Sequence, residues 1–109
     1  MTGGGARRYG APVTKPAAIA EALRRLAPRI PAHEFGAVID HALTSRGLRA
    51  AAPEAAAWLS LVAYVRHALT DYDRLLEEGY DADSARFFVA DEIDAVLEAW
   101  GATRRVGEE

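Results

Sequence analysis

The chain has 109 residues, half of them apolar, with 13 Lys/Arg, 16 Asp/Glu and a formal net charge of −3. A chain of this length forms one domain with a single core. Plentiful alanine and only 8% aromatic residues favour packed helices over sheets. The absence of cysteine excludes disulfides, thiolate catalysis, iron–sulfur clusters and cysteine-ligated zinc.

No apolar run reaches the roughly 18 to 20 residues that a membrane span requires, and the N-terminus lacks the apolar block of a secretory signal. We therefore expect a cytoplasmic protein that does not enter a membrane. Charge is divided unevenly, because residues 1–50 hold eight Lys/Arg and three Asp/Glu whereas residues 51–109 hold five and thirteen. This split indicates either a basic half that faces an acidic partner or, as we favour, two halves that attract each other.

The pattern divides the chain into three segments. Residues 1–15 contain three successive glycines and no apolar periodicity, which predicts a disordered tail. Residues 16–101 form a single helical domain, and residues 102–109, after Gly101, are expected to fray. The fold predicted for the domain is all-α, a compact bundle of four helices with a long third helix at its centre.

The first predicted helix begins near Pro16, next to a cap at Thr14 or Lys15, and ends around residues 26–27 because two prolines follow. Its inner face carries Ile19, Leu23, Leu26 and Ile30. The second helix begins after Pro31 and ends at Gly47. Its predicted core face consists of Phe35, Val38, Ile39, Ala42 and Leu43.

The central helix begins near Pro53 and runs to Glu78, where Gly79 supplies a left-handed cap. Within it, residues 58–76 carry one continuous apolar face, which predicts a single buried rod. That face consists of Trp58, Leu61, Val62, Val65, Leu69, Tyr72 and Leu76.

The last helix is capped by Asp81 or Asp83 and stops at Gly101. Its inner stripe is formed by Ala85, Val89, Ile93, Val96, Leu97 and Trp100. Phe87 lies off this stripe, on the side of Asp91 and Asp94. Either a neighbouring segment covers Phe87, which we favour, or Phe87 is an exposed contact for a partner protein.

One polar flank is the candidate site. Arg66, Thr70 and Asp73 follow at i, i+4 and i+7 beside the apolar face, with His67 adjacent. The flank serves either as a structural clamp between helices, in which Thr70 bonds the backbone one turn back, or as a ligand site. The clamp is the favoured interpretation.

Histidine chemistry has little support in the pattern. His67 is placed to pair with Asp71 on the helix surface, and no candidate nucleophile accompanies it. His33 and His41 lack the i, i+4 spacing with which two side chains hold one metal ion. We therefore expect no catalytic residue, no metal, no cofactor and no small-molecule substrate.

The basic side chains of the first half are the candidate phosphate contacts for nucleic acid. They are Arg24, Arg25, Arg29, Arg46 and Arg49.

Residues 62–100 also resemble a known family. The segment reads VAYVRHALTDYDRLLEEGYDADSARFFVADEIDAVLEAW and is similar to the domain of unknown function 2293, found in uncharacterised bacterial and fungal proteins. LAPRIP and DHAL, further upstream, extend the resemblance to about residues 24–100. Matching positions are Arg66, His67, Thr70, Tyr72, Asp73, Leu75, Leu76, Gly79, Tyr80, Ala85, Arg86, Val96, Leu97 and Trp100.

The resemblance implies no activity. Longer bacterial members carry a cysteine-rich segment and a basic loop that point towards nucleic acid, but this chain has no cysteine and a largely neutral loop, GLRAAAPEAA. We therefore expect a small non-catalytic binding module. It associates either with nucleic acid through its basic first half or with a protein or a second copy through Phe87.

Overall fold

The computed structural model describes residues 14–106. These residues are all-helical and contain no strand, which confirms the predicted fold class, but they form five α-helices where four were predicted. The helices are α2 (Lys15–Leu26), α3 (Ala32–Thr44), α4 (Pro53–Leu69), α5 (Tyr72–Glu77) and α6 (Ala82–Ala99), with a short 3₁₀ turn, η1 (Arg46–Leu48). The predicted tail lies outside the described residues, except for Thr14 and Lys15, which begin α2.

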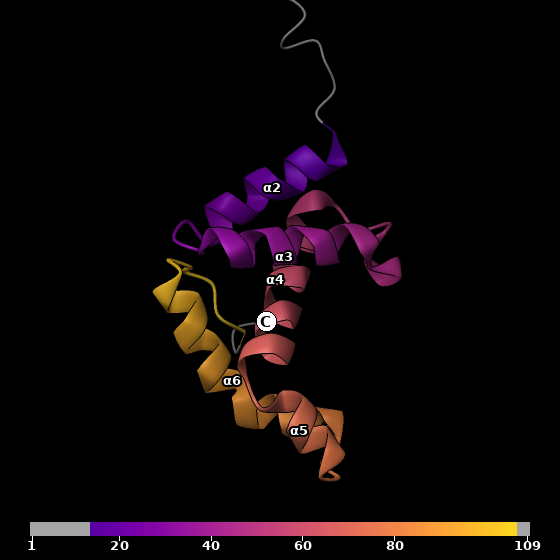
Figure 1. Cartoon of the computed structure of the whole chain (residues 1–109), viewed down its shortest axis with the longest axis vertical. Helices are drawn as coiled ribbons and strands as arrows, with labels where there is room; N and C mark the ends of the chain where they lie inside the picture. The colour runs from indigo at the N-terminus through magenta and orange to yellow at the C-terminus, as the bar shows by residue number, and fades with distance from the viewer. Residues whose placement is uncertain (1–13, 107–109) are drawn as a thin grey trace, which may run out of the picture.

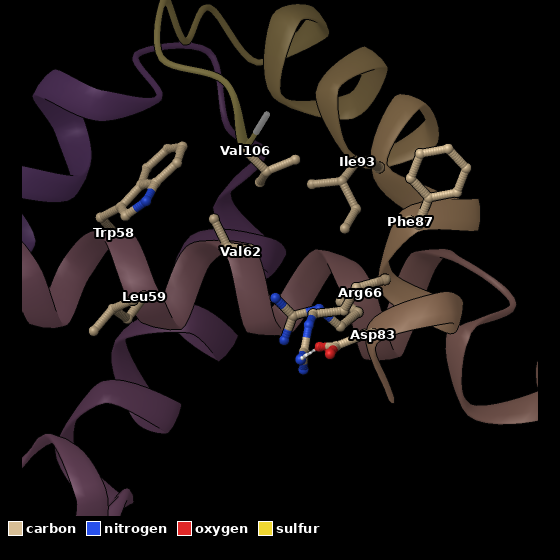
Figure 2. Close-up of a pocket in the computed structure, with 10 residues that line it drawn as sticks. Trp58, Leu59, Val62, Arg66, Asp83, Phe87, Ile93 and Val106 are labelled. Carbon is tan, nitrogen blue, oxygen red and sulfur yellow. Dashed lines mark hydrogen bonds and ion pairs between the residues drawn. The ribbon is translucent and has the colours of Figure 1, made fainter. Parts of the chain in front are cut away.

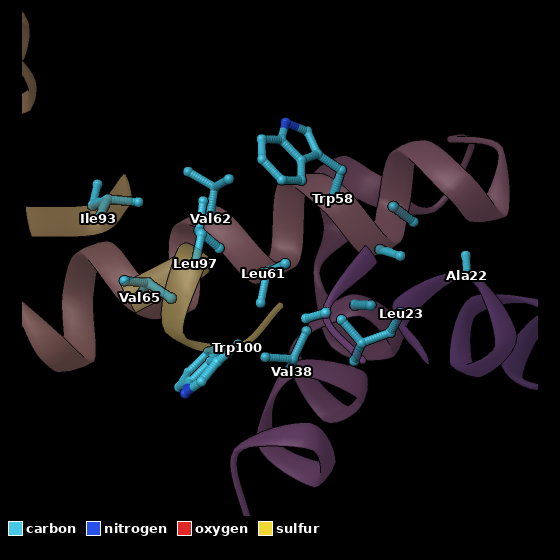
Figure 3. Close-up of a cluster of buried hydrophobic side chains, with 14 of the residues drawn as sticks. Ala22, Leu23, Val38, Trp58, Leu61, Val62, Val65, Ile93, Leu97 and Trp100 are labelled. Atoms are coloured by element: carbon cyan, nitrogen blue, oxygen red, sulfur yellow. The ribbon is translucent and has the colours of Figure 1, made fainter. Parts of the chain in front are cut away.

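α4 is the centre of the fold, as predicted, and it packs against α2, α3, α5 and α6. Figure 1 shows α2 and α3 lying across one end of α4, α6 running beside it and α5 at the other end. The core is continuous along this arrangement. In Figure 3, Leu61 and Val65 of α4 point towards side chains from both sides of the molecule, including Val38 of α3 and Leu97 of α6.

α2 has the predicted bounds and cap. The Thr14 hydroxyl accepts a hydrogen bond from the backbone N–H of Ala17 at 3.2 Å, and Pro16 stands in the first turn. The helix ends at Leu26, before Pro28. Ile19 and Leu23 are fully buried, and they hold α2 against the core.

α3 begins after Pro31 as predicted, but Gly47 does not end it. The helix stops at Thr44, Ser45 is extended, and Gly47 lies inside η1 without a positive φ. Leu43, predicted to face the core, is exposed. Because each helical residue turns about 100° from the one before, burial of Val38 and Ala42 directs Leu43 towards solvent.

The prediction of one rod over residues 58–76 is wrong. α4 ends at Leu69, Thr70 is extended, and the chain restarts as α5 at Tyr72. The Thr70 hydroxyl donates to the carbonyl of Arg66 and accepts from the N–H of Tyr72 at 3.2 Å, so its side chain replaces the backbone bonds of a continuous helix. The break keeps Tyr72 buried, but Leu69 and Leu76 face solvent.

Both predicted glycine caps are present. Gly79, which follows α5, has φ +104°, and Gly101, which follows α6, has φ +88°. Gly101 is also crowded, because a Cβ placed there would lie 3.0 Å from Pro28 Cγ. The same junction is closed by the N–H of Arg29, which donates to the carbonyl of Trp100 at 2.8 Å.

α6 is capped by Asp81, whose carboxylate accepts from the N–H of Ser84 at 2.8 Å. Its predicted inner stripe is buried, with Val96 only partly so. The residues after Gly101, predicted to fray, instead fold back as far as they are described. Arg104 lies over the ring of Trp58 at 4.2 Å, and the N–H of Val106 donates to Asp94 at 2.8 Å.

Candidate functional site

A groove of about 400 Å³ lies between α4, α6 and the returning C-terminal segment. Figure 2 shows Trp58 and Val62 of α4 on the same side as Val106 and Ile93, with Val106 between Trp58 and Ile93, while Arg66 lies beside Asp83 and Phe87 lies further along α6. The groove is formed because α4 and α6 pack side by side through their inner stripes and residues 102–106 close one side. Its lining residues are Trp58, Leu59, Val62, Arg66, Asp83, Arg86, Phe87, Ala90, Ile93 and Val106.

The groove is apolar at its base and at part of its rim. Trp58, Val62 and Ile93 are buried, whereas Leu59 and Phe87 are exposed. Phe87 is 78% exposed, so no neighbouring helix among residues 14–106 covers it. The tail, which the favoured prediction also named as a cover, lies outside the described residues. A contact between Phe87 and a partner protein stays a prediction.

Phe87 belongs to a wider aromatic surface at the start of α6. Its ring meets that of Phe88 edge to face at 6.0 Å between centroids, and Phe88 meets Tyr80 in the same way at 5.3 Å. All three side chains are exposed. An exposed apolar surface of this kind, next to a groove, is typical of a protein-binding site.

Two arginines stand at one end of the groove. Arg86 donates to Asp83 at 2.6 Å, but the Asp83 side chain is 93% exposed and the pair is therefore well solvated. Arg66 is half-buried and lies over the Tyr72 ring at 5.4 Å. Burial lowers the pKa of Arg66; Tyr72 partly opposes this effect, and the positive charge of Arg86 adds a smaller lowering.

The Arg66 guanidinium is incompletely paired. Its Nε is buried, and no residue between 14 and 106 accepts a hydrogen bond from it. Within those residues it forms no ion pair with a carboxylate. A buried donor without an acceptor is costly, and this Nε is closed to solvent.

The predicted polar flank does not assemble as one surface. Because the helix breaks at Thr70, Asp73 turns away from Arg66 and pairs with His67, with 2.7 Å between Nδ1 and Oδ1. Thr70 bonds the backbone one turn back, as the clamp interpretation predicted. Only Arg66 of the four reaches the groove.

His67 has a different partner from the predicted one. It meets Asp73, while Asp71 pairs with Arg74 at 2.7 Å. The His67 and Asp73 side chains are both about half exposed, and the imidazole edge rests on the Tyr72 ring at 5.3 Å. The pair joins α4 to α5 across the break, and neither residue lines the groove.

The five candidate phosphate contacts are all exposed, and they lie towards opposite ends of α2. Arg24 and Arg25 lie in the last turn of α2, while the carbonyl of Arg49 accepts from Lys15 at the first turn. Nine residues of helix place these ends roughly 14 Å apart. Arg46 precedes Arg49 in the same short turn.

Arg24, Arg25 and Arg29, near the end of α2, also contact other parts of the chain. Arg25 pairs with Glu54 at 2.8 Å, and Arg24 lies over the Phe35 ring at 4.9 Å. Arg29 donates through its side chain to the carbonyl of Glu98 at 3.3 Å, at the negative end of the α6 dipole. These contacts hold helices together and reduce the charge available to phosphate.

Residues 14–106 contain no group of three His, Cys, Asp or Glu side chains arranged to hold a metal ion. None of the helices there combines the length and apolar character needed to cross a bilayer.

The sequence prediction identified Phe87 and Arg66 but missed the groove between them. A signal was present, because Asp83, Arg86, Phe87 and Ala90 follow at helical spacing on one face of α6. No sequence pattern predicts that Val106 lines the groove, because its position depends on the fold-back after Gly101.

The comparisons agree with the resemblance noted in the sequence. No curated protein and no solved structure matches the chain. The model of one family, described as uncharacterized conserved protein DUF2293, matches residues 22–101, which include every helix from the later part of α2 to α6. The chain therefore belongs to the DUF2293 family of uncharacterized conserved proteins.

Proposed function

We propose that this protein is a non-catalytic protein-binding module whose groove between α4 and α6 receives a segment of a partner protein. The observation that carries the proposal is the position of Phe87. Its ring is 78% exposed at the rim of a groove whose base is formed by buried Trp58, Val62 and Ile93.

The energetics favour this use of the surface. Covering an exposed phenylalanine contributes roughly 1.5 to 3 kcal/mol. Aromatic and arginine side chains around a desolvated pocket are the commonest binding hot spots in protein interfaces. Phe87 and Arg66 supply side chains of these kinds at one groove.

The polar groups of the groove support a binding role over a catalytic one. They are two arginines and an aspartate already paired with one of them. A hydrolytic or transfer reaction needs a nucleophile beside a base, and no such pair of residues between 14 and 106 lines the groove. The half-exposed pair of His67 with Asp73 lies outside it.

Nucleic-acid binding has weaker support. Phosphate recognition requires basic side chains that follow one backbone. Here the arginines of α2 and those of η1 lie at opposite ends of α2, and the former are engaged with Glu54 and Phe35. We therefore place protein binding first.

Selection of short random peptides on the immobilised full chain tests the proposal. We expect peptides whose affinity for Phe87→Asp is reduced roughly tenfold or more, as for a hot spot. Leu43→Asp is the matched control, because Leu43 is an exposed apolar residue of α3 outside the groove. Peptides indifferent to Phe87→Asp, or none above background, would overturn the proposal.

Folding of the variant must be verified first. Because Phe87 is mostly exposed, Phe87→Asp should change the free energy of unfolding by no more than about 0.5 kcal/mol. Sedimentation of the chain without peptide completes the test. A dimer that dissociates in Phe87→Asp would assign the surface to self-association instead.

A further inference from the structure

The groove carries information about the chemistry of its occupant. Arg66 and Arg86 both line one end, close enough for the charge of Arg86 to act on Arg66. Two cations beside an apolar base repel each other at reduced dielectric. A negative group placed between them would relieve this repulsion.

Among residues 14–106, Asp83 is the only carboxylate that lines this end. Asp83 binds Arg86 at 2.6 Å, and its side chain is 93% exposed. Arg66 has no carboxylate partner within residues 14–106. A carboxylate is the group that guanidinium binds best, because two parallel hydrogen bonds form at once.

The spacing along α4 defines the rest of the ligand. Val62 precedes Arg66 by one helical turn, so their Cβ atoms lie roughly 5 to 6 Å apart, and the long Arg66 side chain carries its guanidinium beyond its own Cβ. A ligand that contacts both therefore needs a bulky apolar group and a carboxylate separated by roughly that distance or somewhat more. Adjacent turns of a partner helix provide this arrangement.

We propose that the groove recognises an acidic protein segment in which a bulky apolar side chain lies about one helical turn from a carboxylate. The apolar side chain rests on Trp58, Val62 and Ile93, and the carboxylate binds between Arg66 and Arg86. This assignment rests on the proposed function and specifies the partner of the same site.

The smallest probe with both groups is 3-phenylpropionate, and 3-phenylpropanamide is its uncharged counterpart. Each is titrated into the ¹⁵N-labelled full chain, following the Trp58 indole N–H and the Ala90 and Ile93 amides. Both probes should shift these signals through the phenyl ring. The carboxylate should bind roughly five- to tenfold more tightly, as expected for a charge-assisted pair at a partly solvated site.

Variants identify the residues responsible for that preference. Arg66→Gln should bring the affinity ratio of the two probes close to one. Arg86→Gln should lower this ratio while leaving the half-buried side chain of Arg66 in place. Arg46→Gln, which changes an arginine outside the groove, should leave the ratio unchanged. Because the ratio is measured within each variant, a small change of groove shape affects both probes alike.

The other outcomes are distinct. Equal binding of both probes at the groove would overturn the carboxylate assignment and leave the protein-binding function standing. The carboxylate assignment would also be overturned by shifts confined to α2 or η1, or by no shift up to the solubility limit. The proposed protein-binding function is tested separately, by the peptide selection. Groove signals that move with protein concentration alone would identify a second copy as the occupant and overturn the proposed partner.

Discussion

The Ser60 hydroxyl is buried in α4 and has no hydrogen-bond partner among residues 14–106. An unpaired buried hydroxyl costs about 1 kcal/mol or more, and serine is also a weaker helix former than alanine. Ser60→Ala should therefore leave the free energy of unfolding unchanged or raise it by up to about 1 kcal/mol. Urea unfolding measures this change, and a loss of more than about 1 kcal/mol would show that the hydroxyl has a partner.

The two left-handed glycines form a matched pair. Alanine at Gly79 meets no atom within 4 Å, so Gly79→Ala should cost only the backbone strain of a positive φ, about 1 kcal/mol. Gly101→Ala carries the same strain and also presses on Pro28 Cγ at 3.0 Å, so about 2 to 3 kcal/mol is expected. Thermal or urea unfolding gives the comparison. Equal losses would mean that Pro28 moves away freely.

At this scale the sequence was informative. The caps at Thr14, Asp81, Gly79 and Gly101 follow from the residues themselves, because a short polar side chain or a glycine satisfies the end of its own helix. Ser60 could not be predicted in the same way. Its cost depends on which side chains surround it.

Among the elements, the break between α4 and α5 depends on Thr70. Thr70→Val keeps the shape of the side chain but removes the bonds to the Arg66 carbonyl and the Tyr72 N–H, and should cost about 1 to 2 kcal/mol of unfolding free energy. Thr70→Ser retains the hydroxyl and should cost much less. If the two variants prove equally stable, the hydroxyl does not hold the break.

This break explains where sequence reasoning failed. Apolar residues keep helical spacing from Trp58 to Leu76, and periodicity alone predicts one rod. A threonine inside such a pattern is compatible with either a continuous helix or an end, because its hydroxyl can bond the previous turn in both. Burial of Tyr72 against the core decides between them, and that is tertiary information.

The start of α6 should respond to pH. The bond from the Ser84 N–H lowers the pKa of Asp81, so the charged form is favoured in the folded state. The resulting stability is complete above the unfolded pKa, near 3.8, and is lost as the pH falls through the lower folded value. Asp81→Asn keeps an oxygen acceptor without the charge. We therefore expect wild type to lose more stability than Asp81→Asn between about pH 5 and pH 2.

Parallel urea unfolding of the two proteins at each pH measures the difference. Asp91→Asn, an exposed acid-to-amide change further along α6, is the control for general charge effects. Identical pH profiles for wild type and Asp81→Asn would contradict a charged cap.

For the whole molecule, the uneven charge of the sequence has a partly internal explanation. Arg25 of the basic first half pairs with Glu54 of the acidic second half, and Arg29 binds the end of α6. The predicted attraction between the halves is therefore present. This association also uses arginines that the sequence offers as phosphate contacts.

The groove was beyond the reach of sequence reasoning because three segments build it. α4 supplies Trp58 and Arg66, α6 supplies Phe87, and the returning chain supplies Val106. The spacing of apolar residues predicts which face of each helix is buried. It does not predict which exposed faces of different helices lie next to each other. No periodic pattern in the sequence predicts the fold-back of residues 102–106. It is stabilised by Arg104 over the Trp58 ring and by the hydrogen bond from the Val106 N–H to Asp94.

We propose that this groove, and not the arginines of α2 and η1, is the surface on which the protein binds a partner. A chemical-shift map of the ¹⁵N-labelled chain, titrated with the tightest peptide from the selection, tests it most directly. We predict that the shifted signals gather at Trp58, Val62, Phe87 and Ala90. Shifts gathered instead at Arg24 to Arg29, or at Arg46 to Arg49, would contradict the account.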